Sequence, residues 1–168
     1  MEIKEAQLEF IQTWGSLGSS WGIPKSMAQI HALLISTPHE LTAEEIMDRV
    51  KISRGNANIN LRELNNWRLV AKVNKLGERK EFFKADHDIW NMARNIVIER
   101  KKRELEPVMR FLNNMESTDF TGNEMEIAHF KNLVSELKEF VQQLDKLSEM
   151  AIRFNDNVVF KKMIKMLK

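Results

Sequence analysis

The chain has 168 residues, with 26 Lys and Arg against 24 Asp and Glu, and it has no Cys, which excludes disulfides and thiolate metal sites. No stretch approaches the roughly 18 consecutive apolar residues of a membrane span, and the acidic, mixed start MEIKEAQLEF is unlike a signal peptide. We therefore expect a cytoplasmic protein with no membrane partner. With only 6 Gly and 3 Pro, the composition favours helices over a sandwich or barrel of short strands.

The positive charge is concentrated in one part of the chain. Residues 51–84 carry nine Lys and Arg and three Glu, a net charge of +6, whereas the remaining residues carry a net charge of −4. A basic segment of this kind is typical of nucleic-acid binding when it coincides with a binding motif. On its own it is more often a solvated surface.

Three helices are predicted before residue 51. The first, over residues 2–18, has an apolar stripe of Ile3, Phe10, Ile11, Trp14 and Leu17, and is weakened near its end by Gly15, Gly18, Ser19 and Ser20. The second begins near Pro24 and has a predicted buried face of Met27, Ile30, Leu33 and Leu34. Thr42 and Glu45 form a predicted capping box for the third, with Leu41 and Ile46 at the staple positions.

The segment ISRGNANINLRELNNWRLV, residues 52–70, predicts the second, DNA-reading helix of a helix-turn-helix. Ser53 is a good N-cap, and Ala57, Leu61 and Leu64 form one buried helix face. The exposed surface then carries Arg, Asn and Gly, which suit a DNA major groove because Arg pairs with guanine and Asn with adenine. An ordinary solvated amphipathic helix is the alternative.

A two-stranded wing is predicted after this helix. Leu69, Ala71 and Val73 alternate with Val70 and Lys72, and residues 80–84 form a second strand. The turn between them, residues 74–79, has Gly77 near its tip. Lys75, Arg79 and Lys80 would contact DNA phosphates or a minor groove from this hairpin.

The remaining residues predict more helices. Asp88 caps a fifth helix, Pro107 kinks or restarts it, residues 117–123 form a loop, and residues 157–168 form a short final helix with a basic face. Over residues 124–155, steps of three and four place apolar residues in a heptad seam: Phe130, Leu133, Leu137, Phe140, Leu144, Leu147, Ala151 and Phe154. Ile127, Val134 and Val141 widen that stripe.

These helices lead us to expect a homodimer, because two-fold symmetry matches two recognition helices to two DNA half-sites. The alternative is a monomer in which the long helix folds back onto the chain. The predicted fold is mainly α, a winged helix-turn-helix with terminal helices that form a dimerisation bundle. Its regions are 1–22 for the N-terminal dimerisation helix, 23–87 for DNA binding and 88–168 for helical dimerisation.

The chain resembles the GbsR branch of the MarR-type winged helix-turn-helix transcriptional regulators over about residues 10–107. The resemblance is carried by WGSLGSSWGIPKS at 14–26, AQIHALLIS at 28–36, LTAEEIMDRVKISRGNANINLRELNNWRLV at 41–70, GERKEFF at 77–83 and DIWNMARNIVIERKKRELEPV at 88–108. It implies a dimeric DNA-binding regulator. The DNA-reading positions it implies are Ser53, Arg54, Gly55, Asn56, Asn58 and Arg62, with Gly77, Arg79 and Lys80 in the wing.

One departure concerns the end of the recognition helix. Family members usually have glycine where Arg68 stands, and an ordinary residue in a left-handed cap costs roughly 1 kcal/mol. We therefore expect this helix to end differently.

No catalytic or metal-binding constellation is found in the sequence, so we predict neither an enzyme nor a cofactor. The histidines at 31, 39, 87 and 129 are scattered. The resemblance links the family to osmoprotectant metabolism, so an aromatic cage could hold a cationic effector near Trp14, Trp21, His31 and Trp90. Plain packing of the tryptophans is the alternative.

The predicted function is that of a homodimeric transcriptional regulator, which binds double-stranded DNA at a pseudo-palindromic operator and responds to a small-molecule effector. A winged-helix module for protein contacts, without operator recognition, is the main alternative. A small enzyme that uses the aromatic residues is a further one, but it lacks clustered acid or base candidates.

Overall fold

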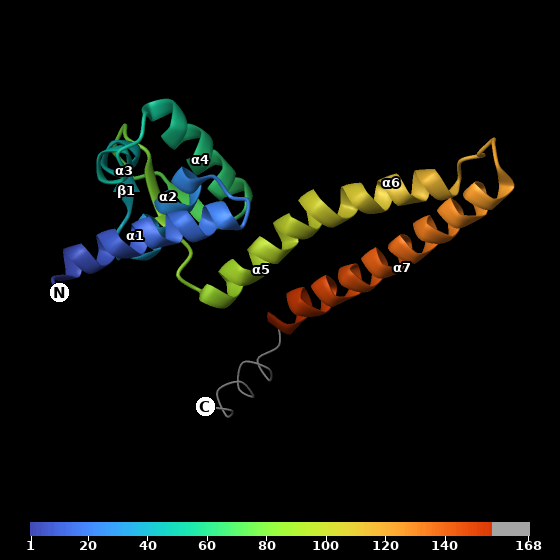
Figure 1. Cartoon of the computed structure of the whole chain (residues 1–168). Coiled ribbons are helices and arrows are strands. Elements are labelled where there is room, and N and C mark those ends of the chain that lie inside the picture. Colours follow the sequence, from blue (N-terminus) through green and yellow to red (C-terminus); the bar gives the residue numbers. More distant parts are fainter. Residues whose placement is uncertain (156–168) are drawn as a thin grey trace, which may run out of the picture. The chain divides into compact units, whose positions relative to one another are not determined.

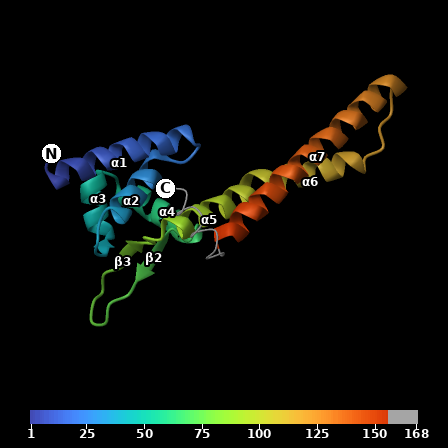
Figure 2. The same cartoon turned by 90° about the horizontal axis from the view of Figure 1, so that it is seen from below.

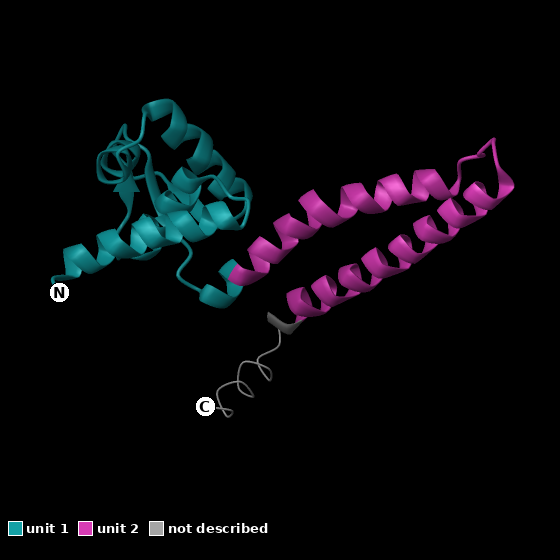
Figure 3. Cartoon of the chain, in the orientation of Figure 1, with its two compact units in different colours: residues 1–92 teal, residues 93–168 magenta. Residues whose placement is uncertain are grey.

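The computed structural model describes residues 1–155, and its helices α3, α4 and α5 begin where the sequence places capping side chains. The elements are α1 (Ile3–Ser20), α2 (Lys25–Ile35), β1 (Leu41–Thr42), α3 (Ala43–Val50), α4 (Arg54–Asn66), β2 (Val70–Val73), β3 (Phe82–Ala85), α5 (Ile89–Arg100), the π-helix η1 (Lys101–Leu105), α6 (Glu106–Glu116) and α7 (Glu124–Asn155) (Figure 1). The chain divides into two compact units, residues 1–92 and 93–168 (Figure 3). The short helix predicted at 157–168 lies outside the described residues.

Three predicted caps are confirmed. Thr42 and Glu45 form the capping box of α3, with the Glu45 carboxylate 2.7 Å from the Thr42 backbone nitrogen. The Ser53 hydroxyl accepts from the Asn56 backbone N–H at the start of α4. Asp88 Oδ1 accepts from the backbone N–H groups of residues 90 and 91 at the start of α5, at 2.9 and 3.1 Å. Local side-chain chemistry thus determines these helix starts.

The core of the first unit is centred on α2, which lies between α1 and α4 (Figure 1). The buried face predicted for α2 is confirmed, since Met27, Ile30, Leu33 and Leu34 are at most 3% exposed. The buried side chains of the neighbouring elements complete this core: Leu41, Ile46, Ala57, Leu61, Leu64, Leu69 and Val70.

The sheet has three strands rather than the predicted two. β1 pairs with β3, with Leu41 opposite Phe83, and β3 pairs with β2, with Val70 opposite Ala85; both pairings are antiparallel. Two residues are too short a strand to leave a period-two pattern, so β1 could not be recognised in the sequence. The loop between β2 and β3 projects from the unit as the wing (Figure 2).

α1 ends at Ser20, two residues later than predicted, and its small residues pack closely on α2. A Cβ added to Gly18 would lie 2.4 Å from the Ala28 Cβ, and one added to Gly15 would lie 2.5 Å from the Gln29 side chain. These glycines were predicted to weaken α1, and in the structure they allow the two helices to approach closely. The apolar stripe predicted for α1 is only partly buried: Ile11 is covered, whereas Ile3, Phe10 and Leu17 are exposed.

The first unit contains both α1 and the helix-turn-helix. α1 packs on α2 within residues 1–92, and the predicted division into residues 1–22, 23–87 and 88–168 stays a prediction. The contribution of α1 to dimerisation stays a prediction.

In the second unit α6 and α7 form a helical hairpin. Leu112 of α6 packs with Val134 and Val141 of α7. Lys138 of α7 is paired with Glu116, and Lys101 Nζ lies 3.0 Å from Asp145 Oδ1. η1 immediately precedes Glu106 and Pro107. Pro107 has no N–H to donate to the carbonyl four residues earlier, so an irregular turn at this point agrees with the predicted kink.

The long helix buries the flank of its predicted seam and leaves most of the seam exposed. Val134 and Val141, expected to widen the stripe, are 5% and 8% exposed and pack on α6. Five of the seam residues are 39–60% exposed: Phe130, Leu133, Leu137, Phe140 and Leu147. None of the helices within residues 1–155 combines the length and apolarity that crossing a bilayer would require.

Candidate nucleic-acid interface

α4 separates an apolar face from a polar one. Ala57, Leu61 and Leu64 are at most 2% exposed. The predicted DNA-reading residues lie on the solvent side and are all exposed: Ser53, Arg54, Gly55, Asn56, Asn58 and Arg62. Ile59 is 56% exposed on this helix as well, an apolar side chain that could contact a thymine methyl group.

A tight turn connects α3 to α4. Lys51 adopts a left-handed conformation with φ of 60°, and its N–H donates to the Met47 carbonyl at 2.8 Å. Ile52 N–H donates to the same carbonyl at 3.2 Å. Since Ser53 then caps α4, the two helices form the predicted helix-turn-helix unit.

The wing loop has a turn at its tip. Gly77 has φ of +83°, and the Glu78 N–H donates to the Lys75 carbonyl at 3.1 Å. These features fit a type II turn, which requires positive φ at its third residue. The neighbouring Leu76 is fully exposed at this tip.

A groove of about 430 Å³ joins α4 to the wing. Arg54 and Asn58 line it from α4, and Arg79 and Lys80 line it from the wing loop. The start of α3 contributes further lining residues, including Thr42, Glu44 and Met47. The fold therefore brings together Arg54 and Asn58 of α4 and, from the wing loop, Arg79 and Lys80, and the role of these residues in DNA contact stays a prediction.

The wing lysines are paired with carboxylates. Lys80 Nζ lies 2.8 Å from Glu44 Oε2, and Lys75 Nζ lies 3.5 Å from Glu40 Oε2 and 4.2 Å from the centre of the Phe82 ring. Lys72 is paired with Glu81. The hydrogen bond and charge of Lys80 lower the pKa of Glu44, and Glu44 in turn raises the pKa of Lys80, so both groups are charged at neutral pH.

Asn56 is held by neighbouring side chains. Its Oδ1 accepts from Ser26 Oγ at 3.0 Å and also from Asn60 Nδ2. Asn60 Nδ2 additionally donates to the Asn56 carbonyl at 2.8 Å. Because a bidentate contact with adenine needs the Asn oxygen as an acceptor, Asn58, which lines the groove, is better suited to it than Asn56.

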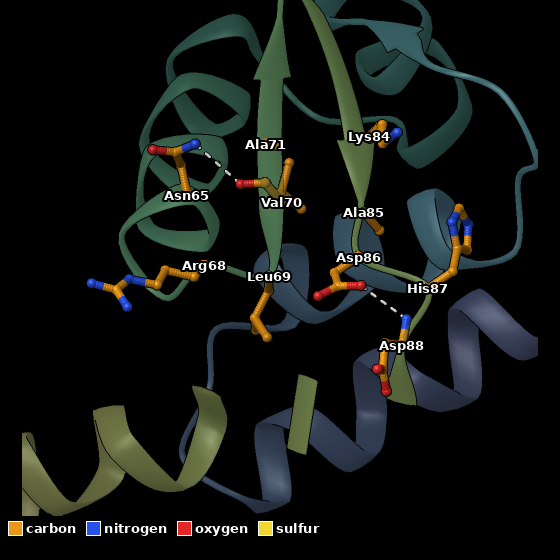
Figure 4. A pocket seen from close by; sticks show the side chains of 10 residues that line it. All are labelled: Asn65, Arg68, Leu69, Val70, Ala71, Lys84, Ala85, Asp86, His87 and Asp88. Carbon is orange, nitrogen blue, oxygen red and sulfur yellow. Dashed lines mark hydrogen bonds between the residues drawn. The ribbon is translucent and has the colours of Figure 1, made fainter. Parts of the chain in front are cut away.

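α4 ends in the left-handed conformation that a glycine would adopt. This corrects our expectation that the helix would end differently at Arg68. Arg68 has φ of +57°, its N–H donates to the Asn65 carbonyl, and the Leu69 N–H donates to the Leu64 carbonyl at 3.0 Å. This is the Schellman arrangement. The following turn packs against the base of the wing, where Asn65 Nδ2 donates to the Val70 carbonyl at 3.1 Å (Figure 4).

The four residues predicted for an effector site lie in different environments. Trp14 and Trp21 meet edge to face at 6.3 Å between ring centres, and Trp90 is 45% exposed in the first turn of α5. His31 is 4% exposed, and burial lowers its pKa from 6.5 to about 4. His31 is therefore a neutral core residue at physiological pH.

Two contributors to the interface were not predicted from the sequence. Glu44 pairs with Lys80 from 36 residues away, and Ser26 anchors Asn56 from 30 residues away. A pattern of neighbouring residues cannot reveal either contact. The sequence marked Glu44 only through its position between Thr42 and Glu45, the two residues of the α3 capping box.

No protein-family model matches the chain, and no curated protein matches it. Among solved structures, the chain is similar to the crystal structure of a transcriptional regulator, with a TM-score of 0.68 and 14% sequence identity. The similarity covers 90% of this chain and 99% of that chain. At this identity the likeness establishes a shared fold: mainly helical, with a small antiparallel sheet, as in winged-helix regulators.

Proposed function

We propose that the chain is a DNA-binding transcriptional regulator of the GbsR-like branch of the MarR type, which acts as a homodimer on a pseudo-palindromic operator. The observation that carries this proposal is the groove in which Arg54 and Asn58 of α4 lie beside Arg79 and Lys80 of the wing. α4 would enter the major groove, while the wing contacts the flanking backbone or minor groove. The protein would act by blocking or repositioning polymerase at a promoter.

The test of DNA recognition is binding to genomic DNA fragments, with the salt dependence measured on the best fragment. We expect fragment-selective binding with a steep salt slope, because each neutralised phosphate contributes about −0.9 to it. Arg54→Ala and Arg62→Ala should reduce selectivity for the best fragment. Arg110→Ala, which removes an exposed arginine from α6, is the charge-matched control.

The homodimer is supported by the exposed apolar stripe of α7, Phe130, Leu133, Leu137, Phe140 and Leu147. A helix of 32 residues is about 48 Å long, so a second copy could cover the stripe along much of its length. Phe111 of α6, in the same hairpin, is 57% exposed as well. Burial of such side chains is the main driving force of association.

Sedimentation equilibrium tests this interface. The unmodified protein should be dimeric, and Phe140→Lys should shift it towards monomer because a charge would be buried in the apolar contact. Gln142→Lys introduces the same charge at an exposed polar position of α7 and should leave the dimer intact. A monomeric unmodified protein would contradict the dimer proposal.

The pairing of Lys72, Lys75 and Lys80 with carboxylates favours the second candidate, a winged-helix module for protein contacts, because it reduces the charge offered to DNA. This candidate predicts weak binding that is equal across all fragments. It also predicts that Arg54→Ala and Arg62→Ala leave that binding unchanged. The fragment experiment therefore separates the two functions.

Effector control is a further part of the proposal, supported by the edge-to-face pair of Trp14 and Trp21, since two rings at 82° can form two walls of a cage for a quaternary ammonium. Titration of the intrinsic tryptophan fluorescence with choline and with betaine tests this. A saturable change that Trp21→Ala abolishes is expected. Equal DNA affinity with and without the ligands would contradict effector control.

A further inference from the structure

Two acidic side chains, Glu44 and Glu81, lie among the basic residues of the groove. Glu44 occupies the first turn of α3 and lines the same groove as Arg54, Asn58, Arg79 and Lys80. Its carboxylate is 2.8 Å from Lys80 Nζ, and the side chains of this pair are 66% and 60% exposed. Both members of the pair are thus accessible to a macromolecule that docks in the groove.

Helix stabilisation explains only part of this placement. A carboxylate in the first turn interacts favourably with the positive end of the helix dipole. However, Glu45 already closes the capping box of α3 and satisfies the Thr42 backbone N–H. An exposed ion pair contributes little to folding, about 0–1 kcal/mol. The contact between Glu44 and Lys80 therefore contributes little to folding, and its larger effect is on the binding of a macromolecule in the groove.

Three lysines of the wing differ from Arg62 and Arg79 in their ion pairs. Lys72, Lys75 and Lys80 each face a carboxylate. Arg62 and Arg79 form no ion pair with any residue in the part of the chain that the structure describes. Lysine binds phosphate as a point charge, whereas arginine also reads guanine. The ion pairs thus reduce the charge available for phosphate and leave these arginines available.

We propose that Glu44 limits the affinity of the groove for DNA by competing with phosphate for Lys80. In this role Glu44 neutralises Lys80 and repels the phosphates that approach it, whatever the base sequence. The inference rests on the proposed DNA-binding function. It concerns the strength of DNA binding, while selectivity comes from α4.

The test compares the full-length protein with its Glu44→Gln variant by fluorescence anisotropy over a series of NaCl concentrations. Two duplexes of equal length are used, one carrying the best genomic fragment and one a scrambled sequence. Glu44→Gln should tighten binding to both duplexes by about fivefold, because a unit charge near a phosphate is removed. The salt slope should become steeper by about 0.9, because Lys80 would then neutralise one more phosphate. The ratio of the two affinities should stay unchanged.

Two further variants serve as controls. Glu5→Gln removes the same charge from the first turn of α1, in the same unit, at a residue that does not line the groove, and should leave affinity and slope unchanged. Adding Lys80→Met to Glu44→Gln should abolish the gain in affinity. A purely structural role for Glu44 would change the unfolding midpoint and leave the salt slope as it was.

The outcomes separate this inference from the proposed function. If the unmodified protein binds DNA and Glu44→Gln behaves like Glu5→Gln, the inference is wrong and the function stands. If Glu44→Gln changes the affinity ratio of the two duplexes, Glu44 reads a base and the competition mechanism is wrong. If neither protein binds any duplex while folded, the DNA-binding function fails, and the inference fails with it.

Discussion

His31 should make the stability of the first unit depend on pH. Its imidazole is 4% exposed on α2, and its Nε2 atom is buried without a hydrogen-bond partner among residues 1–155. Burial lowers its pKa from 6.5 to about 4, because the charged form loses its hydration. The neutral ring is therefore the form that fits the folded core.

The direction of the effect follows from the two protonation states. Between pH 6.5 and about 4 the unfolded chain binds a proton at His31 that the folded chain does not. The free energy of unfolding that depends on a neutral His31 is thus fully present above pH 6.5 and is lost as the pH falls towards 4. At about 1.36 kcal/mol per pH unit, the loss is about 2 kcal/mol between pH 7.5 and pH 5, and about 3 kcal/mol in total.

Urea unfolding followed by tryptophan fluorescence is the suitable assay. All four tryptophans, at positions 14, 21, 67 and 90, lie in the first unit, so the signal reports on that unit. His31→Leu should abolish most of the loss between pH 7.5 and pH 5, at a constant protein concentration. His87→Leu, at an exposed histidine, should retain it.

The reasoning would be refuted if His31→Leu lost as much stability as the unmodified protein over this pH range. Glu40, Glu44 and Glu45 have lowered pKa values as well, so their contributions disappear only as the pH falls through and below their usual value of 4.5. The range above pH 5 therefore isolates His31.

Three substitutions test the backbone geometry. Gly18→Ala should destabilise the first unit by about 2 kcal/mol, because the new Cβ would meet Ala28; an unchanged urea midpoint would contradict the close contact of α1 with α2. Arg68→Gly should stabilise the same unit by about 1 kcal/mol, since it relieves the left-handed conformation, and a loss of stability would show that the side chain matters more than the cap. Gly55→Ala should raise stability by about 0.5–1 kcal/mol, as the added Cβ would meet no side chain or other segment of residues 1–155 beyond its chain neighbours within 4 Å. If the backbone at Gly55 lies close to a DNA phosphate, fluorescence anisotropy should show that Gly55→Ala binds DNA more weakly, although it is more stable. Unchanged DNA binding would contradict a close contact between Gly55 and a phosphate.

Local interactions explain why much of the fold could be predicted from the sequence. Thr42, Ser53 and Asp88 bond to backbone groups two or three residues away, so the starts of α3, α4 and α5 are encoded within single turns. The buried faces of α2 and α4 follow from the 3.6-residue period of a helix. The concentration of positive charge in residues 51–84 is likewise a property of the sequence alone.

Tertiary structure decided which of several compatible surfaces is buried. In α7 both the heptad seam and its flank are apolar. Packing on α6 buries Val134 and Val141 of the flank, whereas Leu137 and Phe140 of the seam stay exposed. In α1 the sequence predicted that the glycines at 15 and 18 weaken the helix, and the tertiary structure places α2 against them. Periodicity gives the direction of a side chain and leaves its partner unspecified.

For the candidate site, too, some features follow from the sequence and others only from the tertiary structure. The sequence by itself determined the capped recognition helix, its exposed Arg and Asn side chains, and the basic hairpin after it. Only the tertiary structure decided that Arg54 and Lys80 line one groove, that Ser26 and Asn60 hold Asn56, and that Glu44 faces Lys80. These contacts join residues up to 36 positions apart, and their geometry depends on how the whole unit packs.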